Sequence, residues 1–316
     1  MFSHLQGVTV IVTQYATEEE LEEIFQKHSI HTVVSTVNPP TRAVHDAQLR
    51  LIRAAAKVDV VKRFVPSEYA IDYNMPDRFA SSSSFFPYSV LTIHLSRLPL
   101  SWKSLKTEAI RELQAHSSAG TLSYTIFHCG YFLDYFAVPH TPSSLPPSYM
   151  IPEIPFVDIA AGKAAIPGDG DTPVTWTHTA DVGRFVAKAC ADPADWCERS
   201  ITIGASATFH SIVAVAEEIT RRKFEVVYDS VEDLRAGKVS EIPAYKKLYD
   251  MFGSKEAVLE MFRAFGLAMA LGDVDFEIAV REGRQGWGSV AVMNEKYPDV
   301  RPVSLRELVE KAWGRV

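Results

Sequence analysis

The stretch VKRFVPSEY, residues 61–69, decides the fold, because it is typical of a buried strand that ends in a short polar turn. A second β-branched run, TVVSTV at 32–37, precedes it, and a helix-forming segment at 42–57 lies between the two. Two strands joined by a crossover helix form the repeating unit of doubly wound parallel sheets. Farther along, WKSLK at 102–106 opens another predicted helix and ends on a lysine. We therefore predict an α/β fold built on a parallel sheet.

The residues that follow these two strands are the first candidates for a site. Ligands of doubly wound sheets bind outside the carboxyl ends of the strands. Thr36 and Val37 follow the first strand, and Ser67 and Glu68 follow the second. We expect these strand ends and the amine of Lys106 to border one common cleft.

The rest of the chain continues the α/β alternation to about residue 229 and is mostly helical afterwards. Helices are predicted at 18–28, 42–57, 102–116, 131–138, 181–191, 208–222 and 304–313. Thr179 or Asp181 can cap the fifth, and His178 is expected to be structural or at a helix cap. Strands are predicted at 8–12, 31–37, 60–65, 122–127, 174–177, 201–203 and 224–228. Between 230 and 271 we expect helices separated by Gly237, Pro243 and Gly253. Residues 70–100 and 139–152 fit neither pattern and are predicted as loops.

Composition limits the possible functions. The chain has 316 residues, 47% of them hydrophobic, which suffices for a large core and suggests one large domain or a domain with a satellite. A net charge of −7 argues against direct nucleic-acid binding. Three cysteines make no disulfide framework, and neither a signal peptide nor an apolar run of about 18 residues is present. We expect a cytoplasmic protein without a membrane span, and composition leaves its oligomeric state open.

A glycine-rich turn for dinucleotide phosphates is missing from the expected place. Such a turn lets the backbone approach the pyrophosphate at a helix N-terminus. Gly7 stands alone, and the next glycine is Gly120. Either the first strand-helix-strand unit is absent, or the protein never bound a dinucleotide.

Lys106 is the main candidate for catalysis. A lysine on this helix can hold a nicotinamide ribose or act as an acid or base, although a solvated helix lysine is the more frequent case. Trp102 lies one turn earlier, where a tyrosine would complete a proton relay. Glu68 is equally compatible with a pocket and with a turn carboxylate. His128 and Cys129 end a strand, where they could line a pocket, but no partner for a cysteine nucleophile is evident. His28 and His31 do not share a helical face, so a metal pair is not expected.

Several blocks carry a family resemblance. Besides VKRFVPSEY they are QLRLIRAA at 48–55, YTIFHCGYFLD at 124–134, GDGDTPVTW at 168–176 and DVGRFV at 181–186. Together they resemble the NmrA-like family, atypical short-chain dehydrogenases that include the isoflavone and phenylcoumaran benzylic ether reductases. The resemblance covers roughly residues 5 to 235.

The resemblance implies a Rossmann-like, doubly wound NADP-binding domain at 1–150 and a smaller, mostly helical substrate domain at 151–316, with some segments returning to the sheet. Lys106 matches the family's helix lysine, which makes it both a catalytic and a cofactor-binding candidate. The other implied cofactor-binding residues are Thr36, Val37, Ser67, Cys129, Tyr131 and Phe132.

Two departures from the family pattern matter. The first strand of this chain resembles the family's third, so the Rossmann domain looks N-terminally truncated, without its glycine turn and its 2′-phosphate-binding residue. Residues 81–101 look inserted. Without the glycine turn the pyrophosphate loses backbone N–H donors, so we expect weakened NADPH binding.

The sequence therefore predicts an NADPH-dependent oxidoreductase that acts on a small molecule in secondary metabolism. Two alternatives stay open: a dinucleotide-sensing regulator that acts through a protein partner, and a lyase or isomerase that uses the same pocket.

Overall fold

The computed structural model describes residues 7–37, 42–72, 99–140, 156–284 and 286–314, with side chains from 104 onward in the third range. The chain divides into two compact units. The first unit comprises Met1–Ser67 and Glu108–Tyr124, and the second comprises Glu68–Thr107 and Thr125–Val316.

A parallel sheet organises the first unit. Its strand order is β1-β2-β3, and the strands are β1 (Thr32–Val34), β2 (Arg63–Val65) and β3 (Ser123–Tyr124). The crossover between β1 and β2 is the helix α2 (Arg42–Lys57). The expected strand-helix-strand unit is thereby confirmed.

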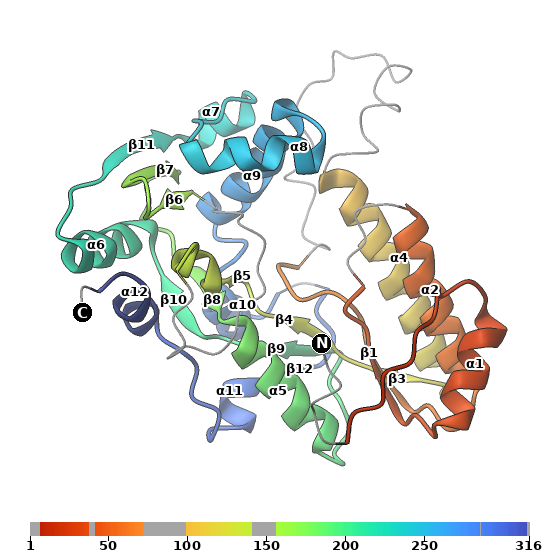
Figure 1. The fold of residues 1–316 in the computed structure, drawn as a ribbon. Coiled ribbons are helices and arrows are strands. Elements are labelled where there is room, and N and C mark those ends of the chain that lie inside the picture. Colours follow the sequence, from red (N-terminus) through yellow and green to blue (C-terminus); the bar gives the residue numbers. More distant parts are fainter. Residues whose placement is uncertain (1–6, 38–41, 73–98, 141–155, 285, 315–316) are drawn as a thin grey trace. The chain divides into compact units, whose positions relative to one another are not determined.

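The helices of this unit pack through α2. Its apolar stripe includes Leu49, Ile52 and Ala55, which are all buried. Helix α1 (Glu18–Lys27) lies beside α2 (Figure 1) and buries Leu21 and Phe25. The predicted helix at 18–28 is confirmed. Thr17 caps it, because its side chain accepts a hydrogen bond from the Glu20 amide at 3.2 Å.

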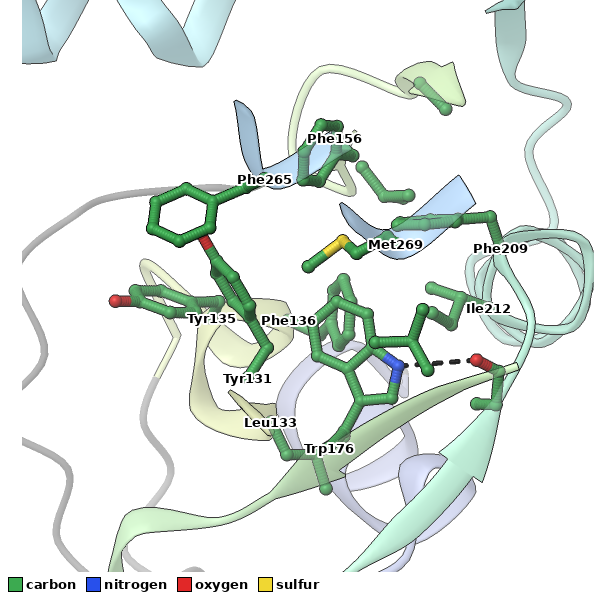
Figure 2. Close-up of a cluster of buried hydrophobic side chains, with 14 of the residues drawn as sticks. Tyr131, Leu133, Tyr135, Phe136, Phe156, Trp176, Phe209, Ile212, Phe265 and Met269 are labelled. Carbon is green, nitrogen blue, oxygen red and sulfur yellow. Dashed lines mark hydrogen bonds between the residues drawn. The ribbon is translucent and has the colours of Figure 1, made fainter. Parts of the chain in front are cut away.

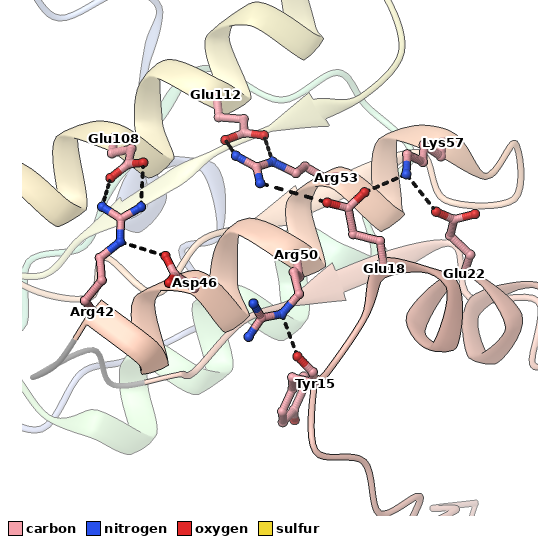
Figure 3. A network of polar contacts seen from close by, with 10 residues as sticks. All are labelled: Tyr15, Glu18, Glu22, Arg42, Asp46, Arg50, Arg53, Lys57, Glu108 and Glu112. Atoms are coloured by element: carbon pink, nitrogen blue, oxygen red, sulfur yellow. Dashed lines mark hydrogen bonds and ion pairs between the residues drawn. The ribbon is translucent and has the colours of Figure 1, made fainter.

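Ion pairs at the surface join α2 to α1 and to a third helix, α4 (Pro99–Ser118; Figure 3). Lys57 pairs with Glu18 of α1 at 2.5 Å. Arg53 pairs with Glu112 of α4, also at 2.5 Å. Such partly exposed pairs contribute about 0–1 kcal/mol each, so the apolar stripe carries more of the stability than the network does.

The predicted strand at 8–12 is wrong. These residues form no strand and pair with none of the strands that the structure describes, and Val12 is 91% exposed. A β-branched run specifies a strand only where a neighbouring strand covers it.

The described residues of the second unit form nine strands in three sheets. One sheet is parallel, in the order β12-β9-β4, and the other two are mixed, in the orders β10-β8-β5 and β11-β7-β6. The strands are β4 (Ile126–His128), β5 (Tyr131–Phe132), β6 (Val157–Asp158), β7 (Lys163–Pro167), β8 (Val174–Thr177), β9 (Arg199–Ile201), β10 (Ala205–Ala207), β11 (Glu225–Asp229) and β12 (Val290–Val292). Strands β4, β8 and β9 are buried throughout, as expected for strands covered on both faces.

Helices surround these sheets and dominate after residue 229, as expected. They are α5 (Thr179–Ala191), α6 (Phe209–Thr220), α7 (Val231–Arg235), α8 (Tyr249–Phe252), α9 (Lys255–Ala270), α10 (Phe276–Glu282), α11 (Met293–Lys296) and α12 (Leu305–Trp313), with the 3₁₀ segments η2 (Leu133–Ala137) and η3 (Pro243–Leu248). The predicted helix at 131–138 is wrong in its first two residues, because Tyr131 and Phe132 pair with β8 as a strand, and Leu133–Ala137 form a 3₁₀ helix. Gly130, with a φ of +69°, changes the direction of the chain between β4 and β5. The hydrophobic pattern of the sequence did not indicate this change.

The core of the second unit contains a group of aromatic rings among aliphatic side chains (Figure 2). Trp176 lies at its centre, with its ring centroid 4.8 Å from that of Phe136 and 6.0 Å from that of Phe209. The indole N–H donates to the Ala207 carbonyl at 3.4 Å, so the one polar atom of this buried ring has a partner. Aromatic pairs at such separations contribute about 0.5–1.5 kcal/mol beyond the area they bury.

Of the residues expected near the start of α5, one is confirmed as its cap. His178, not Thr179 or Asp181, caps the helix, and its Nδ1 accepts from the Ala180 amide at 3.1 Å. The buried carboxylate of Asp134 also accepts from the Thr179 amide at 2.8 Å. A carboxylate that arrives from a distant segment cannot be recognised from the helix sequence alone.

Two predicted loops fall mainly outside the described residues. Of the predicted insertion at 81–101, residues 81–98 lie outside them, and Pro99 to Ser101 belong to α4. Of the predicted loop at 139–152, only residues 139 and 140 are described. In the part of the chain that is described, no helix combines the length and the apolar character that a membrane crossing requires.

Candidate active site

Lys106 occupies a buried position in the second unit. It is 8% exposed, and its Nζ lies 3.4 Å from Oε1 of Glu68, which is 1% exposed. A charge in a protein interior is strongly unfavourable unless a partner compensates it, and each of these two charges compensates the other. The interpretation of Lys106 as a solvated helix lysine is therefore wrong, and so is that of Glu68 as an ordinary turn carboxylate.

A sharp turn after β2 brings Glu68 to this place. Pro66 prevents the strand from continuing as a hydrogen-bonded ladder, and the Ala70 amide donates back to the Glu68 carbonyl at 2.7 Å. Ala70 then forms a parallel bridge with His128, and the Cys129 amide donates to the Ala70 carbonyl at 3.3 Å. The Ser-Glu-Tyr turn and the end of β4 are thus joined directly within the second unit.

The predicted block after β4 is buried rather than open. Cys129 is fully buried, and burial raises the pKa of its thiol, which is the opposite of what a nucleophile needs. The Tyr131 ring lies edge-on to Phe265 at 5.4 Å and is 8% exposed (Figure 2). Phe132 is half-buried, with its ring 6.3 Å from that of Tyr135. Side chains of this block therefore present aromatic surface and no reactive group.

The other three predicted residues belong to the first unit. Thr36 is exposed and Val37 half-buried, just past the end of β1. Ser67 is 9% exposed and donates its backbone N–H to Oε1 of Gln48 at 2.9 Å. That the residues of both units share a cleft stays a prediction.

Gln48 is a polar residue that the sequence reasoning missed. It belongs to a quoted block, but its position on the buried face of α2 was not used. Gln48 falls on the same face of the predicted helix as its Ala, Leu and Ile residues, and this pattern could have indicated a buried glutamine.

A second cluster of charged and aromatic groups surrounds His128. The His128 ring stacks on Trp287, with 5.6 Å between centroids and 3° between planes. The Trp287 indole N–H donates to Asp72 at 2.6 Å, and the guanidinium groups of Arg199 and Arg284 lie 5.8 and 5.1 Å from the Trp287 ring centre. The interpretation of His128 as a pocket residue is not supported, because this ring is enclosed by other side chains.

The acid sensitivity of the fold should depend on His128. Burial lowers the pKa of His128 to about 4, with Arg199 and Arg284 acting in the same direction and Asp72 against it. The ordinary value is about 6.5, so between these limits the unfolded chain binds a proton that the folded chain does not. The contribution of His128 to stability is complete above pH 6.5 or so and is lost as the pH falls toward 4. We expect His128→Phe to remove on the order of 1–3 kcal/mol of this pH dependence.

Urea unfolding of the wild type and of His128→Phe at a series of pH values measures this difference. An equally steep loss of stability in the two proteins between pH 6.5 and 4 would contradict the assignment.

A cavity of about 630 Å³ lies near this cluster, between α10 and β12. Trp287, Arg284 and Lys296 are among its lining residues. None of the predicted site residues lines it, so it does not coincide with the candidate site. Within the described residues, no group of acidic, histidine and cysteine side chains is arranged to hold a metal ion.

Comparison with known proteins identifies the class. The chain is 30% identical over 250 residues to the oxidoreductase swnN of Metarhizium robertsii, covering 79% of this chain and 70% of that protein. It is 34% identical over 219 residues to the oxidoreductase BOA1 of Botryotinia fuckeliana, covering 69% and 63%. The isoflavone reductase homolog A622 of Nicotiana glauca is 23% identical over 233 residues, covering 72% and 62%. No family model matches the chain.

Solved structures agree on the fold. Leucoanthocyanidin reductase of Vitis vinifera in its binary complex with NADPH superposes with a TM-score of 0.61 at 18% identity, covering 96% of this chain and 84% of that one. The Rossmann-like α/β fold expected from the sequence is thus confirmed. The chain belongs to the isoflavone-reductase-like oxidoreductases.

Proposed function

We propose that this protein is an NADPH-dependent reductase that acts on a small molecule of specialised metabolism, within the NmrA-like group. The buried pair of Lys106 and Glu68 is the observation that carries the proposal. An amine kept inside the protein beside a carboxylate is costly, and such groups are frequent at functional sites. The oxidoreductases swnN and BOA1 are relatives of the same class.

The residues present fit part of the cofactor. Lys106 offers three N–H donors for ribose hydroxyls, and the exposed Thr36 follows a strand end where a nucleotide of such a fold binds. Val37, Ser67, Cys129, Tyr131 and Phe132 complete the proposed cofactor contacts. No glycine between Gly7 and Gly120 is available to cradle a pyrophosphate, so the proposal includes weak NADPH binding.

In the proposed reaction, NADPH, when bound, supplies the hydride. Lys106 orients the ribose and donates a proton toward the substrate oxygen, and Glu68 holds the amine in place. The half-buried Phe132 offers aromatic surface to an apolar substrate, which favours an aromatic or polyketide-like molecule.

The proposed organisation follows the same logic. Residues 1–150 form the cofactor domain and 151–316 the substrate domain. The three cysteines have no disulfide partners, which fits a cytoplasmic location.

A dinucleotide sensor is the second candidate. The absence of glycine from residues 8–119 favours it, because a protein that binds the nucleotide weakly and without turnover can still report its concentration. A lyase or isomerase that uses the same pocket is the third.

Titration of the protein with NADPH, followed by nucleotide fluorescence, separates these candidates. Binding together with substrate-dependent oxidation across a panel of aromatic carbonyl compounds supports the reductase. Binding without oxidation points to the sensor. No binding at millimolar NADPH would reject both and leave the lyase or isomerase.

A further inference from the structure

The buried face of α2 changes character along its length. His45 and Gln48 occupy its N-terminal half, and Ile52 and Ala55 follow at helical spacing. All four are 0% exposed. The apolar pair needs no explanation beyond packing, whereas two buried polar side chains do.

Helix direction explains where the polar half lies. A crossover helix runs antiparallel to the strands it joins, so its N-terminal half is next to their carboxyl ends. Those ends are the edge at which ligands of such sheets bind. The polar residues of α2 therefore lie beside the ends of β1 and β2, and the apolar residues cover the body of the sheet.

Gln48 connects the two strand ends. Its Oε1 accepts from Oγ of Ser35 at 2.9 Å and from the backbone N–H of Ser67 at 2.9 Å. The Ser35 amide in turn donates to the Val65 carbonyl at 2.8 Å. The three contacts close a ring that fixes the spacing of the two chains where they leave the sheet.

The orientation of the amide follows from its partners. The Ser67 backbone offers only a donor here, so the carbonyl oxygen of Gln48 must face it. The Nε2 donor then points elsewhere and has no hydrogen-bond partner among the described residues. The unsatisfied Nε2 lowers stability, whereas Oε1 raises it by satisfying two buried donors, so the net effect of Gln48 on stability is small.

We propose that Gln48 is a positioning residue for the dinucleotide, which holds the ends of β1 and β2 so that the backbone at Thr36 and Val37 meets the cofactor in a fixed geometry. The inference rests on the proposed function. It assigns no chemistry to Gln48, which acts through Ser35 and Ser67.

The test compares Gln48→Met with Leu49→Ala. Methionine keeps the length of the side chain and removes both hydrogen bonds. Leu49 is 2% exposed on the same helix, so its truncation leaves a cavity without touching Ser35 or Ser67. Hydrogen exchange at Ser67 and the Kd for NADPH are measured for both variants.

We expect Gln48→Met to speed exchange of the Ser67 amide and to raise the Kd for NADPH about tenfold, the effect of losing one to two hydrogen bonds. Leu49→Ala should leave the Kd within about twofold of the wild-type value.

The outcomes separate the two proposals. If the wild type binds NADPH and Gln48→Met binds it equally well, or if Leu49→Ala weakens binding to the same extent, the role of Gln48 is rejected and the reductase stands. If the wild type does not bind NADPH, the proposed function fails and this inference fails with it.

Discussion

Lys106→Ala is expected to lower kcat by about 10³-fold, with far less effect on the Kd for NADPH. The amine is the polar group placed to transfer a proton in the proposed reaction, and it is buried beside Glu68. Steady-state oxidation of NADPH with a substrate from the panel measures kcat, and a fluorescence titration measures the Kd. Unchanged turnover would remove Lys106 from the mechanism.

The single variant has a side effect that needs a control. Removing the amine takes the Lys106 charge away from the buried Glu68 carboxylate, and breaking such a pair costs about 3–5 kcal/mol of stability. The double variant Lys106→Met with Glu68→Gln removes both charges and should unfold close to the wild-type midpoint while remaining inactive. Lys163→Ala is a matched control, because this lysine pairs with Glu225 on the exposed side of β7, and its loss should leave kcat unchanged.

The same pair illustrates what could be predicted from sequence. The strand, crossover helix and turn that deliver Glu68 follow from local pattern, since each depends on residues close in the chain. The resemblance singled out Lys106. That Glu68 lies 3.4 Å from Lys106 depends on the path of the chain between residues 69 and 105, which no local pattern encodes.

The wrong predictions also arise from contacts between residues far apart in the chain. Residues 8–12 have the composition of a strand but pair with none of the described strands. Tyr131 and Phe132 pair with β8, a neighbour that the sequence does not indicate. Asp134 and Gln48 satisfy backbone donors at positions 179 and 67. Polar residues that serve remote backbone groups look like ordinary loop or helix residues until the fold is known.

Gly130→Ala is expected to destabilise the protein by about 4 kcal/mol or more, which few single substitutions do. Gly130 has a φ of +69°, and a Cβ built on it would lie 1.9 Å from the Thr175 carbonyl oxygen. Thr175 belongs to the buried strand β8, whose backbone is held by the Val274 carbonyl through a hydrogen bond of 2.9 Å. Neither side can move without breaking sheet contacts, so the added methyl group cannot be accommodated.

Gly237→Ala separates the two causes of this loss. Gly237 has a similar φ of +84°, but nothing lies within 4 Å of its Cβ position, so that variant carries the backbone strain alone, about 1–2 kcal/mol. Urea midpoints followed by tryptophan fluorescence compare the two. A similar cost at both glycines would mean that the close approach of Gly130 to β8 is not real. A much larger cost at Gly130 would establish that packing against β8, and not the turn itself, requires glycine between Cys129 and Tyr131.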